Sequence, residues 1–468
     1  MEARFLAIAG GLVALALAVG EAAPQHAPHD FIERDGRFYV NMNVTLLEDF
    51  SLVQEEFCWS WYHLDLGWND EIDAGWSNVA MGRRGELVPK HPWVFPALST
   101  PFFFAFGLGG LLVFNLLALA LAAGGGALFA RGALEGARGP TNAAALTASL
   151  AFVVGAGVLR YAYNYSVDVA LLALWLAGLG AIAQKRGALA GALFAITVCL
   201  KPTALMWMPS VLILALAARD KRMVLRALLA GTAVLVLYAA ANAWIFGRPW
   251  YTGYTRTVIR SGGELVVTDN VNLFGRELLT GLKSNWRWTR TYFAVLLLGA
   301  PGLLSLLRRR PWTFLATLVA IVTTEVVFAL YVYEGDRFHW PGLSFLIPAL
   351  AESVRLLGVV LERRGTPRPV LVAAALGAAL FGYALFYGPF AVGGAVGDGA
   401  LARGATLLAA GELDARAQLP EVQLLGEMGW ADSTLSLSRY GHWSPRTPLV
   451  AAAALAPFGL FGQAGLFL

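Results

Sequence analysis

The side chains best suited to chemistry begin in a polar stretch that follows the first apolar run. Asp35 lies in Glu33-Arg34-Asp35-Gly36-Arg37-Phe38-Tyr39, and Asp49 lies a little further along. A carboxylate placed close to a membrane surface can act as a general base on a hydroxyl or amine. It can equally bind a metal ion or remain a solvated charge. The residue types alone leave these alternatives open.

Three basic residues extend this set. Lys90, in Pro89-Lys90-His91-Pro92, precedes an aromatic segment, 93–106, that suits an interfacial or re-entrant position. A lysine held there would contact a lipid phosphate as a point charge, or it would only snorkel toward water. Lys201 precedes Pro202 between two apolar runs, where a charge is costly outside an interface or polar cavity. Arg337 lies in a short turn, where an ion pair with Asp336 or Glu334 explains it equally well.

The elements that must position these side chains are mostly apolar. Of 468 residues, 57% are hydrophobic and 14% are charged, and the mean hydropathy is +0.60. Soluble domains carry roughly a quarter charged residues, so the excess apolar material is expected to face lipid. The formal net charge of +4 is mild for this length and does not indicate nucleic acid. The two cysteines are too few for a disulfide framework.

Apolar runs recur from one end of the chain to the other. A spanning helix needs about 20 mostly apolar residues, which predicts about 11–13 such helices. The runs are 5–20, 109–129, 143–159, 167–183, 188–200, 204–217, 227–246, 292–307, 313–332, 343–361, 370–387 and 449–468. We expect the first run to be a retained helix, although a cleaved signal peptide has a similar pattern.

Basic residues cluster in alternate short connections and predict the orientation. The clusters are Arg131 with Arg138, Lys185 with Arg186, Arg219 with Lys221 and Arg222, Arg308–Arg310, and Arg363 with Arg364 and Arg368. Such connections are typical of the cytoplasmic side. The long connections 21–92, 247–290 and 388–448 then fall on the opposite, outward side. Connections of this size are usually functional. The first is rich in acidic and aromatic residues, which suits sugar binding, although an aromatic belt at the membrane surface would look similar.

The order of these motifs resembles that of the GT-C superfamily of glycosyltransferases, which are polytopic enzymes that use polyprenyl-phosphate sugars. In that family an outward first loop opens with Asp-(Glu/Gly)-x-x-Tyr, which is similar to Asp35-Gly36-Arg37-Phe38-Tyr39. A Lys-x-Pro-Pro or His-Pro-Pro element follows, and Pro89-Lys90-His91-Pro92 is similar to it. Leu200-Lys201-Pro202-Thr203-Ala204 and Gly335-Asp336-Arg337-Phe338 resemble two later motifs. The similarity covers about residues 5–390.

The resemblance implies roles for single residues. It implies that Asp35 is the catalytic base that activates the acceptor and that Lys90 touches the lipid phosphate. The implied substrate-binding residues are Lys90, His91, Lys201, Arg337, Tyr39 and Asp49. Gly36 stands where the family usually has Glu, so no metal site is predicted. No cofactor is assigned, and nothing in the sequence supports a divalent metal.

The sequence therefore predicts an all-α, GT-C-like, multi-pass protein of a bacterial inner membrane. We expect a catalytic core over 1–390, with periplasmic loops 21–92 and 247–290, a short periplasmic segment over 391–447 and a final transmembrane helix over 448–468. The core would move a hexose or pentose from a polyprenyl-phosphate carrier to a glycan, lipid or protein acceptor on the periplasmic face, with inversion. The predicted partners are these substrates and membrane lipids, without nucleic acid. The alternatives are a secondary transporter or flippase of lipid-linked substrates, and a non-catalytic membrane assembly protein.

Two sequons, Asn43-Val44-Thr45 and Asn164-Tyr165-Ser166, would suit a eukaryotic secretory protein. The Ala-, Gly- and Arg-rich composition is more typical of a GC-rich bacterial genome. The sequons are interpreted as chance matches.

Overall fold

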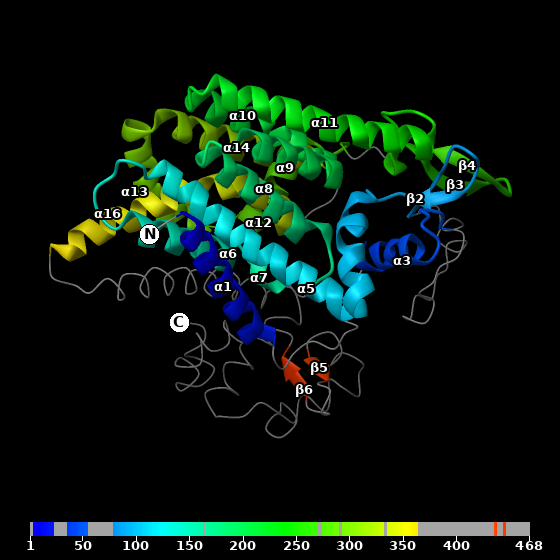
Figure 1. Ribbon diagram of the computed structural model, residues 1–468, viewed down its shortest axis with the longest axis horizontal. Helices are drawn as coiled ribbons and strands as arrows, with labels where there is room; N and C mark the ends of the chain where they lie inside the picture. The colour runs from blue at the N-terminus through cyan, green and yellow to red at the C-terminus, as the bar shows by residue number, and fades with distance from the viewer. Residues whose placement is uncertain are drawn as a thin grey trace.

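The protein is described by a computed structural model over residues 3–22, 35–54, 78–161, 164–268, 274–289, 293–331 and 335–363, with two short strands at 435–437 and 443–445. Among these residues, four helices are long and apolar enough to cross a membrane, namely Gly109–Ala133, Lys221–Phe246, Pro311–Leu330 and Trp340–Val360. Shorter apolar helices pack between and beside them (Figure 1). The predicted class, a mostly helical polytopic membrane protein, is confirmed.

The helices, with the shorter 3-10 segments written η, follow one another along the chain. They are α1 Ala3–Ala22, α3 Asp35–Glu48, α5 Val94–Ala133, α6 Thr141–Gly155, α7 Val158–Tyr161, α8 Val167–Ala183, α9 Gly187–Leu200, η2 Pro202–Trp207, α10 Met208–Ala217, α11 Lys221–Phe246, η3 Gly253–Arg256, α12 Leu278–Thr289, α13 Phe293–Arg309, α14 Pro311–Leu330, η5 Asp336–Phe338, α15 Trp340–Leu343, η6 Ser344–Leu346 and α16 Ile347–Glu362. Every predicted apolar run as far as residue 361 coincides with one or more of these helices. The runs 370–387 and 449–468 lie outside the described residues.

The aromatic segment at the start of α5 forms a helical arm of its own. Gly107 has a φ of 57° and interrupts the helix, a conformation that side chains other than glycine rarely adopt. A Cβ at Gly110 would lie only 1.8 Å from the carbonyl oxygen of Phe102. Glycine at both positions therefore lets the arm fold back against the helix that follows it.

The two long connections that the sequence analysis treats as loops contain regular structure. Strands β1 Val79–Met81, β2 Leu87–Pro89, β3 Thr257–Ser261 and β4 Glu264–Thr268 form an antiparallel sheet in the order β2-β1-β3-β4. Ala80 opposite Thr257 joins the two connections. The chain is mostly helical as expected, and these short strands are an addition that the sequence does not predict. Strands β5 Leu435–Leu437 and β6 Trp443–Pro445 form a separate antiparallel pair within the predicted segment 391–447.

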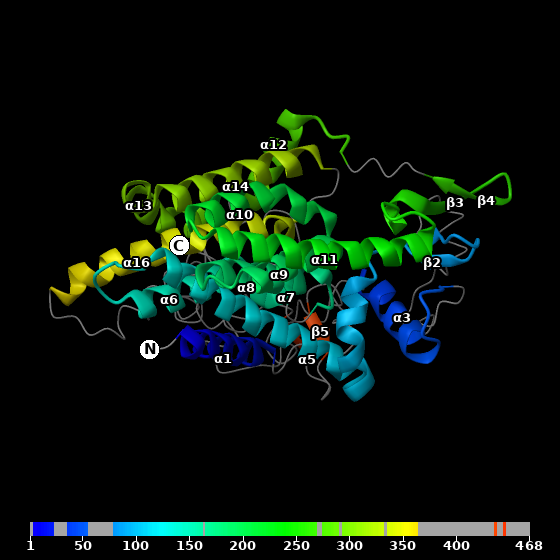
Figure 2. The ribbon, with the colours of Figure 1, turned by 45° about the horizontal axis from the view of Figure 1, so that its top comes forward.

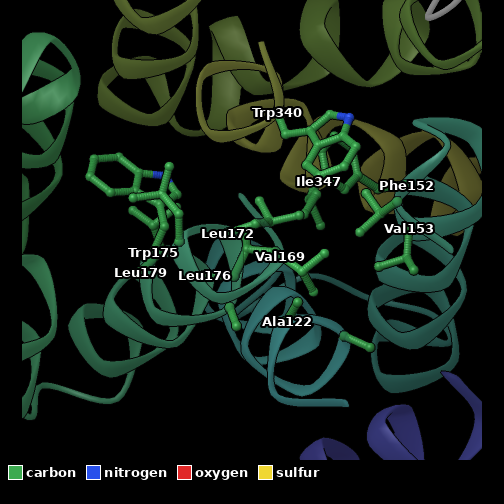
Figure 3. Packing of buried hydrophobic residues seen from close by; sticks show 14 of the residues in the cluster. Ala122, Phe152, Val153, Val169, Leu172, Trp175, Leu176, Leu179, Trp340 and Ile347 are labelled. Carbon is green, nitrogen blue, oxygen red and sulfur yellow. The ribbon is translucent and has the colours of Figure 1, made fainter. Parts of the chain in front are cut away.

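The core lies between the helices and is built from aliphatic and aromatic side chains. Figure 3 shows Val169 and Leu172 of α8 beside Ile347 and Phe152 of two other helices. Buried tryptophans need a partner for the indole N–H. Trp340 donates to the carbonyl oxygen of Ala156 over 2.9 Å, and Trp207 donates to Thr324 Oγ1 over 2.8 Å. These bonds fix large rings between helices that are distant in sequence.

The basic turns gather at one end of the helix bundle. The Arg310 guanidinium donates to the carbonyl oxygen of Glu135, and the Arg355 guanidinium donates to that of Arg138. A Cβ at Gly187 would lie 2.0 Å from the carbonyl oxygen of Met223, so the first turns of α9 and α11 touch. Because α8 ends and α9 begins at this end, the first residues of α8 and the last residues of α9 lie at the opposite end. That end also carries α3 and the four-stranded sheet (Figure 2).

Candidate functional site

A buried carboxylate binds two basic side chains at the end of the bundle opposite the basic turns. Asp168, in the first turn of α8, is 3% exposed. Lys201 Nζ lies 2.9 Å from Asp168 Oδ1, and Arg337 Nε lies 3.1 Å from Asp168 Oδ2. Buried charges are stable in proteins only when they are paired in this way. These three residues, called here the Asp168 triad, carry a formal net charge of +1.

A local break in the helices places Lys201. The residue caps α9 in an extended conformation, with φ −154° and ψ 107°, because Pro202 begins η2 and lacks the N–H that would continue the helix. The ammonium group lies 4.3 Å from the centre of the Phe338 ring. A cation over an aromatic face is attracted by the ring quadrupole. The lysine is therefore held between Asp168 and Phe338 and remains 19% exposed.

Arg337 points to the triad rather than to its sequence neighbours. Its side chain is 19% exposed, and its guanidinium lies 5.4 Å from the centre of the Phe338 ring. The alternative of a local ion pair with Asp336 or Glu334 concerns side chains outside the described part of the chain. Arg337 forms its ion pair with Asp168, a residue on a distant helix, and this brings Arg337 and Lys201 to the two oxygens of one carboxylate.

A second group of side chains surrounds His91 at the end of β2. His91 Nε2 lies 3.0 Å from Asn78 Oδ1, and Nδ1 lies 3.2 Å from the Tyr254 hydroxyl. An amide oxygen only accepts, so these contacts fit a neutral imidazole that donates from Nε2 and accepts at Nδ1. The rings of Phe38 and Tyr39 pack against it at 6.0 and 5.6 Å between centroids. His91 thus joins α3, β2 and η3.

Charged side chains from the triad and from α3 act on the pKa values of both His91 and Tyr39. Burial lowers the pKa of His91 below its ordinary value; Asp35 opposes this shift, and Lys90 and Lys201 add to it. Burial likewise raises the pKa of Tyr39 well above its ordinary range, with Asp35, Tyr254 and Asp168 acting in the same direction and Arg337 against them. Charges act strongly over a few ångströms and fade beyond about 10 Å in salt. The geometry agrees: Asp35 lies one helical turn before Tyr39, whose ring packs against His91 and Tyr165, and Asp168 follows Tyr165 by three residues.

Helix α3 is anchored so that its first turn faces these groups. Asn43 Nδ2 donates to the Tyr165 hydroxyl over 2.7 Å, and Thr100 Oγ1 donates to Asn43 Oδ1 over 2.8 Å. Asn43 is fully buried, which agrees with the interpretation of its sequon as a chance match. Tyr39, one turn before Asn43, is 2% exposed and packs edge-on against Tyr165 at 6.3 Å. Asp35 begins the same helix and is partly exposed.

A cleft opens beside these groups. It is lined by Lys90, Trp93, Pro202, Tyr238, Phe246 and Tyr254, and it holds about 250 Å³ including the part open to solvent. Pro202 links the cleft to the triad, since it directly follows Lys201. One cation and several aromatic rings thus line a hollow that adjoins a positively charged cluster. Its lining offers a cation to an anionic group and aromatic faces to a ring-shaped one, but its enclosed space is only about 10 Å³, close to what one water molecule needs.

Most of the predicted site residues come together at this end. Asp35, Tyr39, Lys90, His91, Lys201 and Arg337 all belong to the groups described above. Asp49 does not, because it follows the last residue of α3 and is exposed. With a rise of 1.5 Å per residue, α3 separates Asp49 from Asp35 by about 20 Å.

Sequence reasoning missed Asp168 as a site residue, although a signal was present. Asp168 is the only charged residue of the apolar helix Val167–Ala183. An ionisable residue inside such a segment marks a functional site by default. Within the described residues, no group of three or more His, Cys, Asp and Glu side chains is arranged to hold a metal ion.

No protein-family model and no curated protein sequence matches the chain. Among solved structures, the chain is similar to ArnT from Cupriavidus metallidurans bound to undecaprenyl phosphate, with 14% sequence identity, a TM-score of 0.48, and coverage of 99% of this chain and 76% of that one. The apo state of the same protein is similar at 15% identity, with the same TM-score and coverage. At this level the likeness concerns the course of the backbone, and it assigns neither a ligand nor a residue role to this chain.

Proposed function

We propose that the chain is a membrane glycosyltransferase that moves a sugar from a polyprenyl-phosphate carrier to an acceptor. The observation that most supports this function is the Asp168 triad, a fixed positive cluster that adjoins the cleft lined by Lys90. Asp35 begins α3 one turn before Tyr39, whose ring packs against His91 at the same end. The resemblance of the sequence motifs to GT-C enzymes supports the same function. Helices long enough to cross a membrane are consistent with a lipid-linked donor.

The cations would bind the donor and stabilise its leaving group. Lys90 contacts the lipid phosphate as a point charge, and Lys201 and Arg337 add the surplus positive charge of the triad. When the bond between the anomeric carbon and the phosphate oxygen breaks, negative charge increases on that phosphate. Basic groups fixed in advance lower the energy of this charge separation without reorganising. Asp168 acts as a positioning residue that aims Lys201 and Arg337 and prevents them from repelling each other.

Asp35 would act as the general base. It removes the proton from the acceptor hydroxyl or amine as that group attacks the anomeric carbon, and the carrier phosphate leaves from the opposite side of the sugar. A single displacement of this kind inverts the anomeric configuration. Tyr39 and His91 are held by other side chains, so they shape the site around the sugar rather than transfer protons.

The side of the membrane follows from charge. The basic turns gather at the end opposite the site, and such turns favour the cytoplasmic side. In a bacterial inner membrane the site would then face the periplasm, where lipid-linked sugars meet glycan, lipid or protein acceptors. The donor sugar is a hexose or pentose.

The test is transfer of a radiolabelled sugar by the purified protein in lipid nanodiscs. Polyprenyl phosphates that carry hexoses or pentoses are supplied with candidate acceptors, and the wild type is compared with Asp35→Asn. Loss of the base is expected to lower the rate about 10²–10⁴-fold. Glu264→Gln, which removes an exposed carboxylate at the same end, is the matched control and should retain full rate. Absence of transfer from every donor, or full activity of Asp35→Asn, would refute the proposal.

One observation favours a second function. The α9–η2 break at Lys201 and Pro202 places a charge at a discontinuous helix, as at the binding sites of many transporters. A flippase of lipid-linked sugars would move a fluorescent polyprenyl-phosphate sugar across a proteoliposome bilayer and leave its glycosidic bond intact. Sugar transfer without such movement supports the enzyme, and movement without transfer supports the flippase. A membrane assembly protein would do neither.

A further inference from the structure

Exposed arginine and tryptophan side chains concentrate where α11 ends. Trp244 and Trp250 are each 67% exposed, and Arg248 between them is exposed. The tip of the β1–β2 hairpin adds Arg83 and Arg84, which are also exposed. These five residues are called here the arginine–tryptophan patch.

Backbone contacts hold the two parts of the patch together. The backbone N–H of Arg83 donates to the carbonyl oxygen of Ile245 over 2.9 Å, which fixes the hairpin tip to the last turn of α11. Arg256 Nε donates to the carbonyl oxygen of Met81 over 2.6 Å. The guanidinium groups of Arg248 and Arg256 lie 5.3 and 5.6 Å from the centre of the Tyr251 ring. The patch is therefore one surface rather than a set of unrelated side chains.

This surface is positively charged, although it lies at the end of the bundle opposite the basic turns. In the described segments 82–87 and 247–264, five arginines stand against two glutamates, which gives a formal net charge of +3. One of those carboxylates, Glu86, accepts from the backbone N–H of Arg84 over 2.8 Å and closes the hairpin. Basic residues normally gather at one side of a membrane protein, and here that side is the opposite end of the bundle. A second positive surface therefore points to an anionic partner at this end.

The position along α11 identifies the partner as lipid headgroups. Only 6% of the apolar window of α11 is buried, and Val236 and Leu237 are 60% and 71% exposed, as expected for a helix that faces acyl chains. Its 26 residues extend about 39 Å, more than the roughly 30 Å hydrocarbon core. The last turn of α11 thus reaches the headgroup layer, where tryptophans are enriched and where arginine can form bidentate bonds to phosphate.

We propose that the arginine–tryptophan patch binds anionic phospholipid headgroups in the leaflet at the site end of the molecule. This binding holds the four-stranded sheet against the membrane beside the cleft, since Ala80 and Val88 of the sheet pack on Ile245 and Phe246 of α11. The inference does not depend on the reaction that the site catalyses.

The experiment measures quenching of Trp250 by brominated lipids in nanodiscs. The fluorescence lost in Trp250→Phe isolates this tryptophan from the others. Brominated phosphatidylglycerol is titrated into phosphatidylcholine discs, and brominated phosphatidylcholine serves as the uncharged arm. We expect phosphatidylglycerol to quench Trp250 at a much lower mole fraction, with the preference reduced by high salt. Each basic residue near an anionic surface contributes about a fivefold preference, so Arg84→Gln with Arg248→Gln should weaken the preference about 25-fold.

Matched variants make the result decisive. Arg222→Gln with Arg226→Gln removes two exposed charges from the other end of α11 and should leave the quenching of Trp250 unchanged. Arg84→Lys with Arg248→Lys should retain most of the preference. Equal quenching by the two lipids would overturn the proposal, as would an unchanged preference in the Arg84 and Arg248 double variant. Displacement of phosphatidylglycerol by inorganic phosphate alone would identify a soluble-anion site instead and also overturn it.

Discussion

Two buried carboxylates, one at each end of the helix bundle, each bind two basic side chains. At the site end these are the members of the Asp168 triad. At the basic end, Glu352 is fully buried and binds Arg309 Nη1 over 2.8 Å and Arg355 Nε over 2.7 Å; these three are called here the Glu352 triad. The formal charges of the two triads are identical, so charge alone does not separate a structural clamp from a reactive site.

The surroundings of the two triads differ. Glu352 also accepts from the Ser305 hydroxyl over 2.6 Å, and Arg355, on the same helix, donates onward to the carbonyl oxygen of Arg138. These bonds tie α16 to α13 and to the α5–α6 turn. The Asp168 triad joins three separate segments, and both of its cations remain 19% exposed beside a cleft. Exposure does not separate the two triads, since Arg309 is 36% exposed and Lys201 and Arg337 are each 19% exposed. The comparison teaches that position does: the Glu352 triad ties helices together at the basic end, whereas the Asp168 triad adjoins the cleft through Pro202.

The first test of the difference between the triads removes one cation from each. Lys201→Met is expected to lower kcat/KM for sugar transfer about 10²–10³-fold, because it removes charge that stabilises the departing phosphate. Arg309→Met, the matched change in the Glu352 triad, should alter kcat/KM less than about twofold per folded molecule. Transfer rates in nanodiscs measure both. Equal losses in the two variants would show that neither triad is a specific binding site.

The second test removes each carboxylate and compares the free energies of unfolding. Breaking a buried ion pair typically costs about 3–5 kcal/mol, and since Arg309 is 36% exposed, Glu352→Gln should cost about 2–4 kcal/mol. Asp168→Asn should cost less, because Lys201 and Arg337 can turn toward the cleft. The midpoints of unfolding in denaturant give both values. A larger loss for Asp168→Asn would make the Asp168 triad the structural clamp.

How much of the structure at these two ends can be predicted depends on how far apart in sequence the contacting residues lie. Apolar length and composition are local properties, so helices such as α8 and α14 fall where the runs 167–183 and 313–332 predict them. The clusters of basic residues in the short turns are also a local property, so the sequence alone identifies the end of the bundle at which they lie. Strands of three to five residues are too short to show a clear alternation, so the sheet was not predicted.

The candidate site was predicted as a set of residues and not as a set of contacts. Lys201 and Arg337 were identified because a charge beside apolar segments is costly. Their common partner, Asp168, lies 33 residues before Lys201 and much further from Arg337, a separation that no local pattern encodes. Local reasoning favoured the neighbours of Arg337 for the same reason. Tertiary packing, which brings the start of α8 to the end of α9 and to η5, decides the pairing.

A third prediction concerns the pH dependence of the site end. Because burial lowers the pKa of His91, the unfolded state takes up a proton first as the pH falls below the ordinary histidine value of about 6.5. Stability is thus highest above that value and falls as the pH drops toward the lowered pKa, by at most about 1.4 kcal/mol per pH unit for one proton. Denaturant midpoints at a series of pH values measure this slope.

His91→Asn is the comparison for this prediction. The variant should show a flatter curve over the same pH range, because Asn does not titrate, and its stability at neutral pH should be lower because the contacts to Asn78 and Tyr254 are lost or lengthened. An unchanged slope in His91→Asn would assign the pH dependence to other groups. The Glu352 triad contains no histidine, so Glu352→Gln should leave the slope as it is.

The smallest expected effect is that of substituting Asp49, which lies at the opposite end of α3 from Asp35. Asp35 and Asp49 stand at the two ends of α3, about 20 Å apart, whereas a base must lie about 3 Å from the proton it removes. If Asp35 is the base, Asp49 is too distant to share its role, and its exposed side chain loses only a solvated charge on substitution. Asp49→Asn should therefore change the transfer rate less than about twofold, or about 0.4 kcal/mol in activation free energy. A loss comparable to that of Asp35→Asn would mean that the acceptor approaches from the far end of α3, and the reactive site would then have to be placed away from the Asp168 triad.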